Sequence, residues 1–300
     1  MLVFRIDASA KSGFQPLAGS VYLASLLKKY VDMRFCINRD KAVVKFLQDK
    51  KIPLCQPENL FKKPVQSLLF YVEDFTPADR ELLLRAKKDG IKTVRITAPG
   101  RKVEETGCDY LLSGPAYAIL HHRFRHFNGA KRKYRKRVKN ILISLEEAVE
   151  YRELRDIIDL LHRQRFNIKI ALTSHTRRIS RKILKRLYPG LRFVGNSESL
   201  ARPFFEADTA LIVPGIAAYE AAAAGTPALY LSYGKDRESC AEFFEKENLG
   251  IKISKAGDIV PQVGQLSLER RITMGSAGKS LVDAKGVYRI IDFLKEKGII

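Results

Sequence analysis

Short apolar segments alternate with segments of helical period along most of this chain, and this alternation constrains its fold more than any other feature. Residues 3–6 are apolar apart from one arginine, and residues 17–30 follow with apolar side chains at the three- and four-residue spacing of a helix. Because strands that alternate with helices form parallel sheets covered on both faces, the pattern predicts an α/β fold.

The alternation occurs in two series. In the first, strands are predicted at residues 3–6, 33–37, 67–72, 92–96 and 110–112, and helices at 17–30, 41–50 and 77–89. In the second, strands are predicted at 140–144, 167–173, 192–194, 209–213 and 228–232, helices at 150–163, 177–187, 197–207, 217–224 and 237–246, and a final amphipathic helix at 276–297. Two such series predict two facing doubly wound, Rossmann-like domains, in which ligands lie beyond the carboxyl ends of the strands.

The domain boundaries follow from these series and from one segment between them. We expect a first α/β domain over residues 1–120, a linker over 121–139, a second α/β domain over 140–275, and a helix over 276–300 that returns to the first domain. A chain of 300 residues has the length of two ordinary domains.

The predicted linker is the most basic part of a basic chain. It contains nine Lys and Arg residues and no acid, in a protein whose 54 Lys and Arg exceed its 33 Asp and Glu to give a net charge of +21. Such a chain attracts anions. Two interpretations of residues 121–139 stay open: a solvated hinge without a specific partner, or a segment that adheres to an anionic membrane surface or to nucleic acid. We find no RNP-like aromatic motif, zinc finger or GxxG module that would favour nucleic acid.

Cysteine spacing and hydropathy exclude several classes of protein. Cys36, Cys55, Cys108 and Cys240 form no C-x-x-C pair, so we expect neither a disulfide framework nor a zinc site, and no motif calls for another metal or a cofactor. No apolar run approaches the roughly 20 residues of a membrane-spanning helix. The N-terminal residues resemble a strand rather than a signal peptide. The expected location is the cytoplasm, with the inner face of the membrane as a peripheral alternative.

The most informative stretch follows the predicted strand at 209–213. It runs through Pro214 and Gly215 into a helix of small residues that contains Glu220. Gly215 permits a tight turn and close approach of a ligand, and the N-terminus of the helix suits a diphosphate. Glu220 lies about one turn further, and its carboxylate is able to accept two hydroxyls of a ribose. The alternative is an ordinary strand–helix–strand unit whose alanines serve close packing.

A family resemblance runs through these motifs. Residues 215–238, GIAAYEAAAAGTPALYLSYGKDRE, resemble the nucleotide-sugar signature of GT-B enzymes, close to that of the glycosyltransferases that add N-acetylglucosamine to lipid I. Residues 4–14, 108–112, 114–124 and 281–289 resemble, in the same order, segments of the UDP-sugar hydrolases of pseudaminic acid biosynthesis. The matches touch both ends and the middle of the chain, so the resemblance implies a GT-B-like architecture throughout.

The resemblance also implies a ligand and a set of site residues. UDP or a UDP-sugar would be held by the second domain, with Glu220 on the ribose and the backbone of Gly215, Ile216 and Ala217 on the diphosphate. The other positions implied to bind substrate are Gly13, Val194 near the uracil, and the segment of Lys235, Asp236, Arg237, Glu238 and Ser239 near the sugar. Asp7, at the end of the first predicted strand, is the candidate catalytic carboxylate. Its alternative role is to cap its own loop.

Two departures from the family weaken the hydrolase interpretation. The hydrolases carry a catalytic histidine in the first loop, where this chain has Pro16, which can neither donate nor accept a proton. Glu146 and Glu147 replace a glycine-rich loop after the strand at 140–144. Two carboxylates would repel a nearby diphosphate by about 1 kcal/mol or more; a cation or a basic partner is the alternative ligand.

These residues lead to one function with two alternatives. The leading hypothesis is a UDP-sugar-processing protein of surface-glycan biosynthesis that resembles the pseudaminic-acid hydrolases and cleaves the sugar–phosphate bond. The first alternative is a GT-B glycosyltransferase with a membrane-associated acceptor. The second is a catalytically degenerate relative that binds a nucleotide or a partner without turnover.

Overall fold

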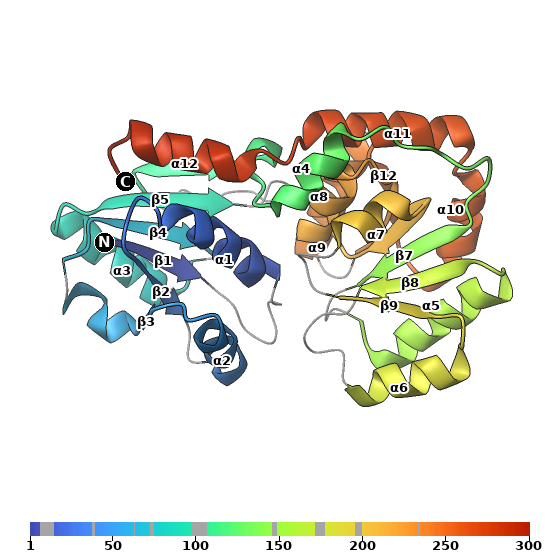
Figure 1. Ribbon diagram of the computed structural model, residues 1–300, viewed down its shortest axis with the longest axis horizontal. Coiled ribbons are helices and arrows are strands. Elements are labelled where there is room, and N and C mark those ends of the chain that lie inside the picture. Colours follow the sequence, from blue (N-terminus) through green and yellow to red (C-terminus); the bar gives the residue numbers. More distant parts are fainter. Residues whose placement is uncertain are drawn as a thin grey trace. The chain divides into compact units, whose positions relative to one another are not determined.

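The computed structural model of the chain is shown in Figure 1. It describes residues 1–6, 15–37, 40–62, 64–72, 75–97, 107–145, 149–171, 178–195, 200–232 and 235–300. By internal contacts the chain divides into two compact units. Unit 1 comprises Met1–Ile119 together with Lys285–Ile300, and unit 2 comprises Leu120–Ala284.

Unit 1 is built on sheet A, in which every described pair of neighbouring strands is parallel. Its strands are β1 (Leu2–Ile6), β2 (Met33–Ile37), β3 (Leu54–Cys55), β4 (Ser67–Tyr71), β5 (Lys92–Thr97) and β6 (Tyr110–Ser113). Its helices are α1 (Gln15–Leu27), α2 (Lys41–Asp49), α3 (Pro77–Lys88) and α12 (Gly286–Glu296), with 3-10 turns η1 (Pro57–Lys62) and η2 (Pro115–Tyr117). The strand order β3-β2-β1-β4-β5-β6 is that of a Rossmann-like sheet.

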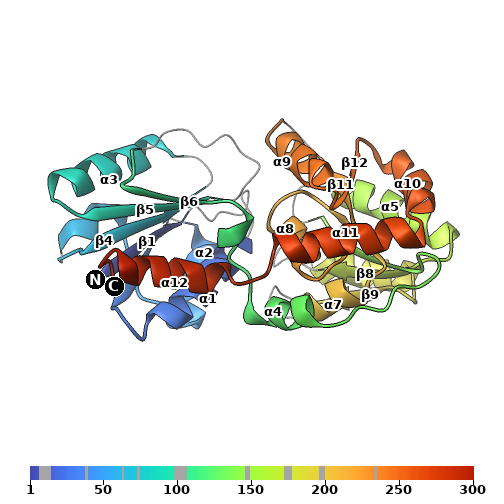
Figure 2. The ribbon, with the colours of Figure 1, turned by 90° about the horizontal axis from the view of Figure 1, so that it is seen from above.

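Alternating side chains of sheet A enter two cores, because successive residues of a strand point to opposite faces. Phe4 and its even-numbered neighbours in β1 pack with buried residues of α1, α2 and α12. Val3 packs on the opposite face with buried residues of α3. Helices therefore cover both faces of the sheet, and Figure 2 shows α12 and α3 on its two sides.

A buried ion pair joins β1 to α3 within the second of these cores. The Arg5 Nε donates to Asp79 Oδ1 at 2.5 Å, and the two side chains are only 2% and 0% exposed. Asp79 also completes the N-terminal cap of α3, because its Oδ2 accepts from the Thr76 N–H at 3.0 Å and from the Thr76 hydroxyl. One carboxylate therefore both starts the helix and fixes it to the central strand.

Two cysteines that are distant in the sequence are neighbours in sheet A. Cys36 in β2 and Cys55 in β3 are in register on adjacent strands, and both are buried free thiols. A hydrogen bond with Cys55, together with burial, raises the pKa of Cys36. Sequence spacing gave no sign of this pair because strand order decides which residues meet.

Unit 2 is built on sheet B, whose neighbouring strands are also parallel. Its strands are β7 (Asn140–Ser144), β8 (Asn167–Ala171), β9 (Arg192–Val194), β10 (Thr209–Ile212), β11 (Ala228–Leu231) and β12 (Gly250–Ile253). Its helices are α4 (His122–Gly129), α5 (Tyr151–Arg163), α6 (Arg178–Leu187), α7 (Ala201–Glu206), α8 (Ile216–Ala223), α9 (Lys235–Lys246), α10 (Ile259–Gln265) and α11 (Leu268–Leu281), with the 3-10 turn η4 (Ala256–Asp258). The order β12-β11-β10-β7-β8-β9 repeats the Rossmann-like arrangement of sheet A.

The helices of unit 2 are divided between the two faces of sheet B. Ile141 and Ile143 share a core with buried residues of α5, α6 and α10. On the opposite face the Phe244 ring of α9 packs on Tyr230 of β11 and on Tyr219 of α8, with ring centroids 5.5 and 4.9 Å apart. The α/β prediction with two Rossmann-like domains is confirmed.

The single helix expected over residues 276–297 is wrong. The structure has two helices, α11 and α12, separated at residues 282–285, and α11 belongs to unit 2 while α12 belongs to unit 1. Ala284 adopts a left-handed backbone conformation with φ of 55°. This breaks the helical path between them, since L-residues in a helix have negative φ.

Candidate functional site

The topological switch point of sheet B lies between β7 and β10. These two strands are neighbours, yet the chain leaves β7 toward α5 on one face of the sheet and leaves β10 toward α8 on the other. In doubly wound sheets ligands bind beyond the carboxyl ends of the strands at this point. The β10–α8 turn, which sequence analysis singled out, therefore lies at the position that the topology favours for a ligand.

The turn itself presents the start of α8 at this edge of the sheet. Gly215 is the N-cap residue and is half-buried, and its carbonyl accepts the first helical bond from the Ala218 N–H at 3.1 Å. The N–H groups of Ile216 and Ala217 come before the first intrahelical donor and carry the positive end of the helix dipole. The backbone here has the donors that an anion requires.

Helix α9 holds this turn in place. The Arg237 guanidinium donates through Nη1 to the Pro214 carbonyl at 2.6 Å. Arg237 was expected to face the sugar together with its neighbours in residues 235–239, but the contact described for its guanidinium is to the backbone of the turn. The sequence did show a cation near the start of α9. Its partner, the Pro214 carbonyl, could not be predicted, because only the folded sheet brings the two groups together.

Glu220 lies in the second turn of α8 and is 3% exposed. Its neighbours in the helix are Ala217, Ala218, Tyr219 and Ala221, all of them buried. Burying a carboxylate is costly unless hydrogen bonds or a charged partner compensate. Glu220 is the one acid of α8, so it is the candidate polar side chain of this site.

The alanines of α8 have a packing role, as the alternative interpretation expected. Helix α11 lies along α8 (Figure 2), and a methyl group at Gly278 would come within 2.9 Å of the Ala222 carbonyl. Gly225 ends α8 in the left-handed conformation with φ of 68°. Small residues on both helices allow this close approach, so the alanines alone do not indicate a ligand.

The residues predicted to face the sugar occupy the start of α9. Glu238 pairs with Lys252 of β12 at 2.7 Å, and this hydrogen bond lowers the pKa of Glu238. Ser239 is exposed. Lys235 and Asp236 belong to α9, but their side chains lie outside the described residues.

Val194 ends β9, which forms the edge of sheet B beyond β8. It is half-buried, and three strand spacings put β9 about 14 Å from β10. The predicted uracil and ribose positions are thus spread along the carboxyl edge of one sheet. Asp7, Gly13, Glu146 and Glu147 lie outside the described residues, as does the side chain of Pro16.

The basic segment at residues 121–139 belongs to unit 2 and is packed against it, which differs from the expected linker. It begins with α4, whose Phe124 is fully buried beside Phe204 of α7. The Asn128 amide donates to the carbonyls of Ala223, Lys279 and Val282 at 3.0–3.1 Å.

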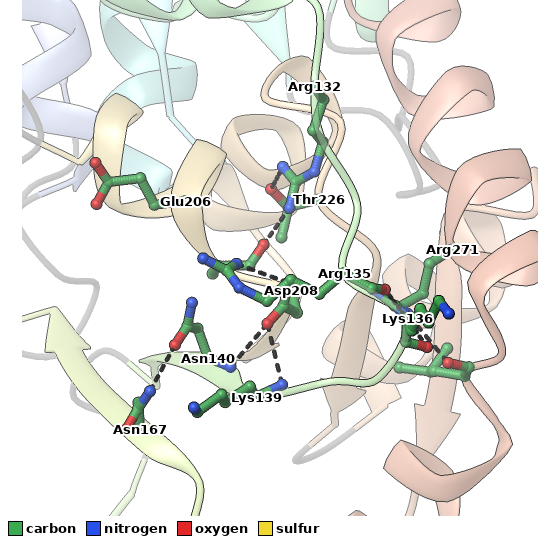
Figure 3. A network of polar contacts seen from close by, with 12 residues as sticks. Arg132, Arg135, Lys136, Lys139, Asn140, Asn167, Glu206, Asp208, Thr226 and Arg271 are labelled. Atoms are coloured by element: carbon green, nitrogen blue, oxygen red, sulfur yellow. Dashed lines mark hydrogen bonds and ion pairs between the residues drawn. The ribbon is translucent and has the colours of Figure 1, made fainter.

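Residues 130–139 continue as an extended strip held by a polar network (Figure 3). Arg132 donates to the Thr226 hydroxyl at 2.8 Å and to the Ala207 carbonyl, and burial lowers the pKa of its guanidinium to about 10. Asp208 accepts from Arg135 Nη1 at 3.1 Å and from the Lys139 N–H at 3.0 Å. Arg271 donates to the carbonyls of Arg135 and Lys136 at 2.6 and 3.2 Å. Part of the positive charge therefore serves structure.

The described residues contain neither a membrane-crossing helix nor a cluster of metal ligands. None of the helices in those ranges combines the length and apolar character that a bilayer crossing requires. Nor do three His, Cys, Asp or Glu side chains gather in that part of the chain as they would around a metal ion.

Comparison with known proteins identifies the fold. No protein-family description matches the chain. It is 24% identical over 212 residues to the spore coat polysaccharide biosynthesis protein SpsG of Bacillus subtilis (strain 168), and the match spans 65% of this chain and 61% of that relative. Among solved structures it is similar to MurG of Acinetobacter baumannii, with a TM-score of 0.67 and 13% identity over 98% of this chain and 99% of that one. It is also similar to LpCGTa, solved in complex with UDP, with a TM-score of 0.65 and 10% identity over 97% and 98% of the two chains. The chain has the GT-B fold.

Proposed function

We propose that this chain binds a UDP-sugar at the carboxyl edge of sheet B and acts in surface-glycan biosynthesis. One observation carries the proposal: α8 begins at the switch point of a Rossmann-like sheet and carries the buried Glu220 one turn further. The helix start suits a diphosphate, and a carboxylate accepts two ribose hydroxyls. The polysaccharide-biosynthesis relative and the UDP-bound structural neighbour support this assignment.

The proposed reaction breaks the bond between the anomeric carbon and the diphosphate oxygen, so that UDP leaves. A new carbon–oxygen bond forms to water in a hydrolase or to an acceptor hydroxyl in a transferase, and the nucleophile loses its proton. Pro16 offers no proton acceptor where the hydrolase family has histidine, so Asp7 is the proposed base for either reaction. In the third form of the proposal, the chain binds a nucleotide or a partner and catalyses no reaction.

Thermal unfolding in the presence of UDP tests the binding step. At about one hundred times its dissociation constant, UDP stabilises a protein that binds it by about 2.7 kcal/mol, which raises the melting temperature of a unit of this size by roughly 5–10 °C. Calorimetry with and without UDP measures this shift. An unchanged melting temperature at millimolar UDP contradicts the proposal.

Replacing Glu220 with alanine tests the ribose assignment. We expect the affinity for UDP to fall by about tenfold or more, because two hydrogen bonds to hydroxyls are lost. Isothermal titration with UDP and with 2′-deoxy-UDP measures the effect. If Glu220 binds the 2′-hydroxyl, the loss of affinity caused by Glu220→Ala and the loss caused by removing that hydroxyl should not add. Glu247→Ala, at an exposed position after α9, is the matched control. Equal UDP affinity in Glu220→Ala and the control rejects the assignment.

Replacing Arg237 with alanine tests the geometry of the β10–α8 turn. Loss of the bond from the guanidinium to the Pro214 carbonyl is expected to weaken UDP binding by roughly three- to tenfold, because charged hydrogen bonds contribute about 1.5–3 kcal/mol and only part of this reaches the ligand. The substitution should weaken the binding of UDP and of 2′-deoxy-UDP by the same factor, so that the ratio of their two dissociation constants stays unaltered. If the ratio changes as well, Arg237 contacts the ribose instead of holding the turn.

Release of UDP from a panel of UDP-sugars separates the three forms of the proposal. Release in buffer alone supports the hydrolase, release only with added acceptor supports the transferase, and binding without release supports the degenerate relative. An acceptor at an anionic membrane, reached through residues 121–139, is part of the transferase form. Exposed cations of that segment include Lys131, Lys133, Lys136, Arg137 and Lys139.

A further inference from the structure

Helix α6 combines positive charge with exposed apolar side chains. Its ten residues, RISRKILKRL, include five Lys or Arg and no acid. Ile183 is 43% exposed and Leu187 is 53% exposed. Residues four apart are neighbours on a helix surface, so these two side chains form one apolar patch. Among the described residues, no other helix exposes two large apolar side chains at this spacing.

The packing of α6 explains why this patch is left outside the core. Leu184 is fully buried in the core of unit 2, and Tyr188, just after the helix, is buried as well. The Arg181 guanidinium lies over the Phe193 ring of β9, 5.4 Å from its centroid. These three residues fix the inner side of α6, and Ile183 and Leu187 lie on its flank.

The charges around the patch are favourable for an anionic surface. Lys182, Lys185 and Arg186 are exposed, and none of them pairs with an acid in the described part of the chain. Of the three acids of the neighbouring helix α5, Glu153, Asp156 and Asp159, the last two lie within 4.0 Å of Arg155 on their own helix. Asp159 also accepts from the Tyr188 hydroxyl. The α6 cations are therefore available to a ligand.

We propose that α6 docks unit 2 onto an anionic lipid bilayer, with Lys182, Lys185 and Arg186 on the headgroups and Ile183 and Leu187 at the boundary with the acyl chains. Basic amphipathic helices bind such interfaces through both contributions. Single-stranded nucleic acid is bound by charge together with stacking aromatic side chains, which this patch lacks, and duplex binding through phosphates gives no role to the exposed apolar side chains. Residues 130–139 offer charge alone, because the one aromatic residue of that stretch, Tyr134, turns its hydroxyl inward and donates to the Gly225 carbonyl at 3.2 Å. The proposal does not depend on UDP binding.

Vesicle flotation without nucleotide tests the proposal. The probes are vesicles of phosphatidylcholine alone and of equal parts phosphatidylcholine and phosphatidylglycerol. We expect the full chain to float only with the anionic vesicles, and less so as salt is added. The triple substitution Lys182→Gln, Lys185→Gln, Arg186→Gln and the double substitution Ile183→Ser, Leu187→Ser should each lower the partition coefficient by about tenfold or more.

Two matched controls separate α6 from general effects. Lys28→Gln, Lys29→Gln, Lys88→Gln removes the same charge from exposed positions of unit 1, and Leu84→Ser removes a 70% exposed apolar side chain from α3. Both should float as the unaltered chain does. Three results would overturn the proposal. They are an equal loss of flotation in the charge control, no loss in the α6 variants, and binding of an acidic peptide or an RNA oligonucleotide through α6 in the absence of vesicles. Far-ultraviolet circular dichroism confirms that each variant is folded.

Discussion

Replacing Asp79 with alanine is expected to lower the free energy of unfolding of unit 1 by about 3–5 kcal/mol, because it leaves the buried Arg5 guanidinium without its carboxylate. The same change removes the cap at Thr76. Hydrogen exchange at the amides of β1 is the suitable measurement, since two units need not unfold in one transition.

Two further variants make this expectation specific. Asp89→Ala removes the exposed partner of Arg85, 3.9 Å away, and should change stability by about 0.5 kcal/mol or less. The double substitution Arg5→Met, Asp79→Leu replaces both charges with apolar groups and should recover most of the loss. If Asp79→Ala is no more damaging than Asp89→Ala, the buried pair does not hold α3 on the sheet.

Replacing Gly286 with alanine is expected to destabilise unit 1 by about 3 kcal/mol, at the upper end of overpacking effects. A methyl group at this first residue of α12 would lie 2.3 Å from the Ala118 carbonyl oxygen and 2.8 Å from the Ala118 nitrogen. Both neighbours are backbone atoms, so no side chain can turn aside. Protease cleavage within residues 285–300, followed by mass spectrometry, reports whether α12 has detached.

Gly264→Ala is the matched control for this effect. Gly264 lies in α10, and a methyl group there would meet nothing within 4 Å. Since alanine favours a helix over glycine by about 1 kcal/mol, the control should be neutral or stabilising. A Gly286→Ala chain as stable and protease-resistant as this control would show that α12 can shift away from Ala118.

Most strands were predictable, because an apolar run ended at polar or turn-forming residues, but β3 and β12 were missed. The predicted bounds of β2, β7 and β9 match the structure residue for residue. Helix α4 was missed because its sequence, HRFRHFNG, has only two large apolar residues beside two arginines and two histidines. What holds it is tertiary: the Phe124–Phe204 contact and the three bonds from Asn128, which no local pattern contains.

The candidate site was predictable in part for the same reason. A Pro-Gly step between a buried strand and a run of small residues indicated the start of α8, and Glu220 stood out as its one acid. The bond from Arg237 to the Pro214 carbonyl depends on how the helices lie over the sheet, so the sequence could not indicate it. The roles of Asp7 and Gly13, which lie outside the described residues, stay predictions.

The division of the chain has a consequence for its biosynthesis. Unit 2 is one continuous stretch, Leu120–Ala284, whereas unit 1 needs Lys285–Ile300 to fill its core with Val287, Ile290 and Leu294. A ribosome translates sheet A first but releases α12 only after all of unit 2. During synthesis the apolar face that α12 covers is therefore exposed while the other unit folds, and this nascent surface is the one a chaperone would meet.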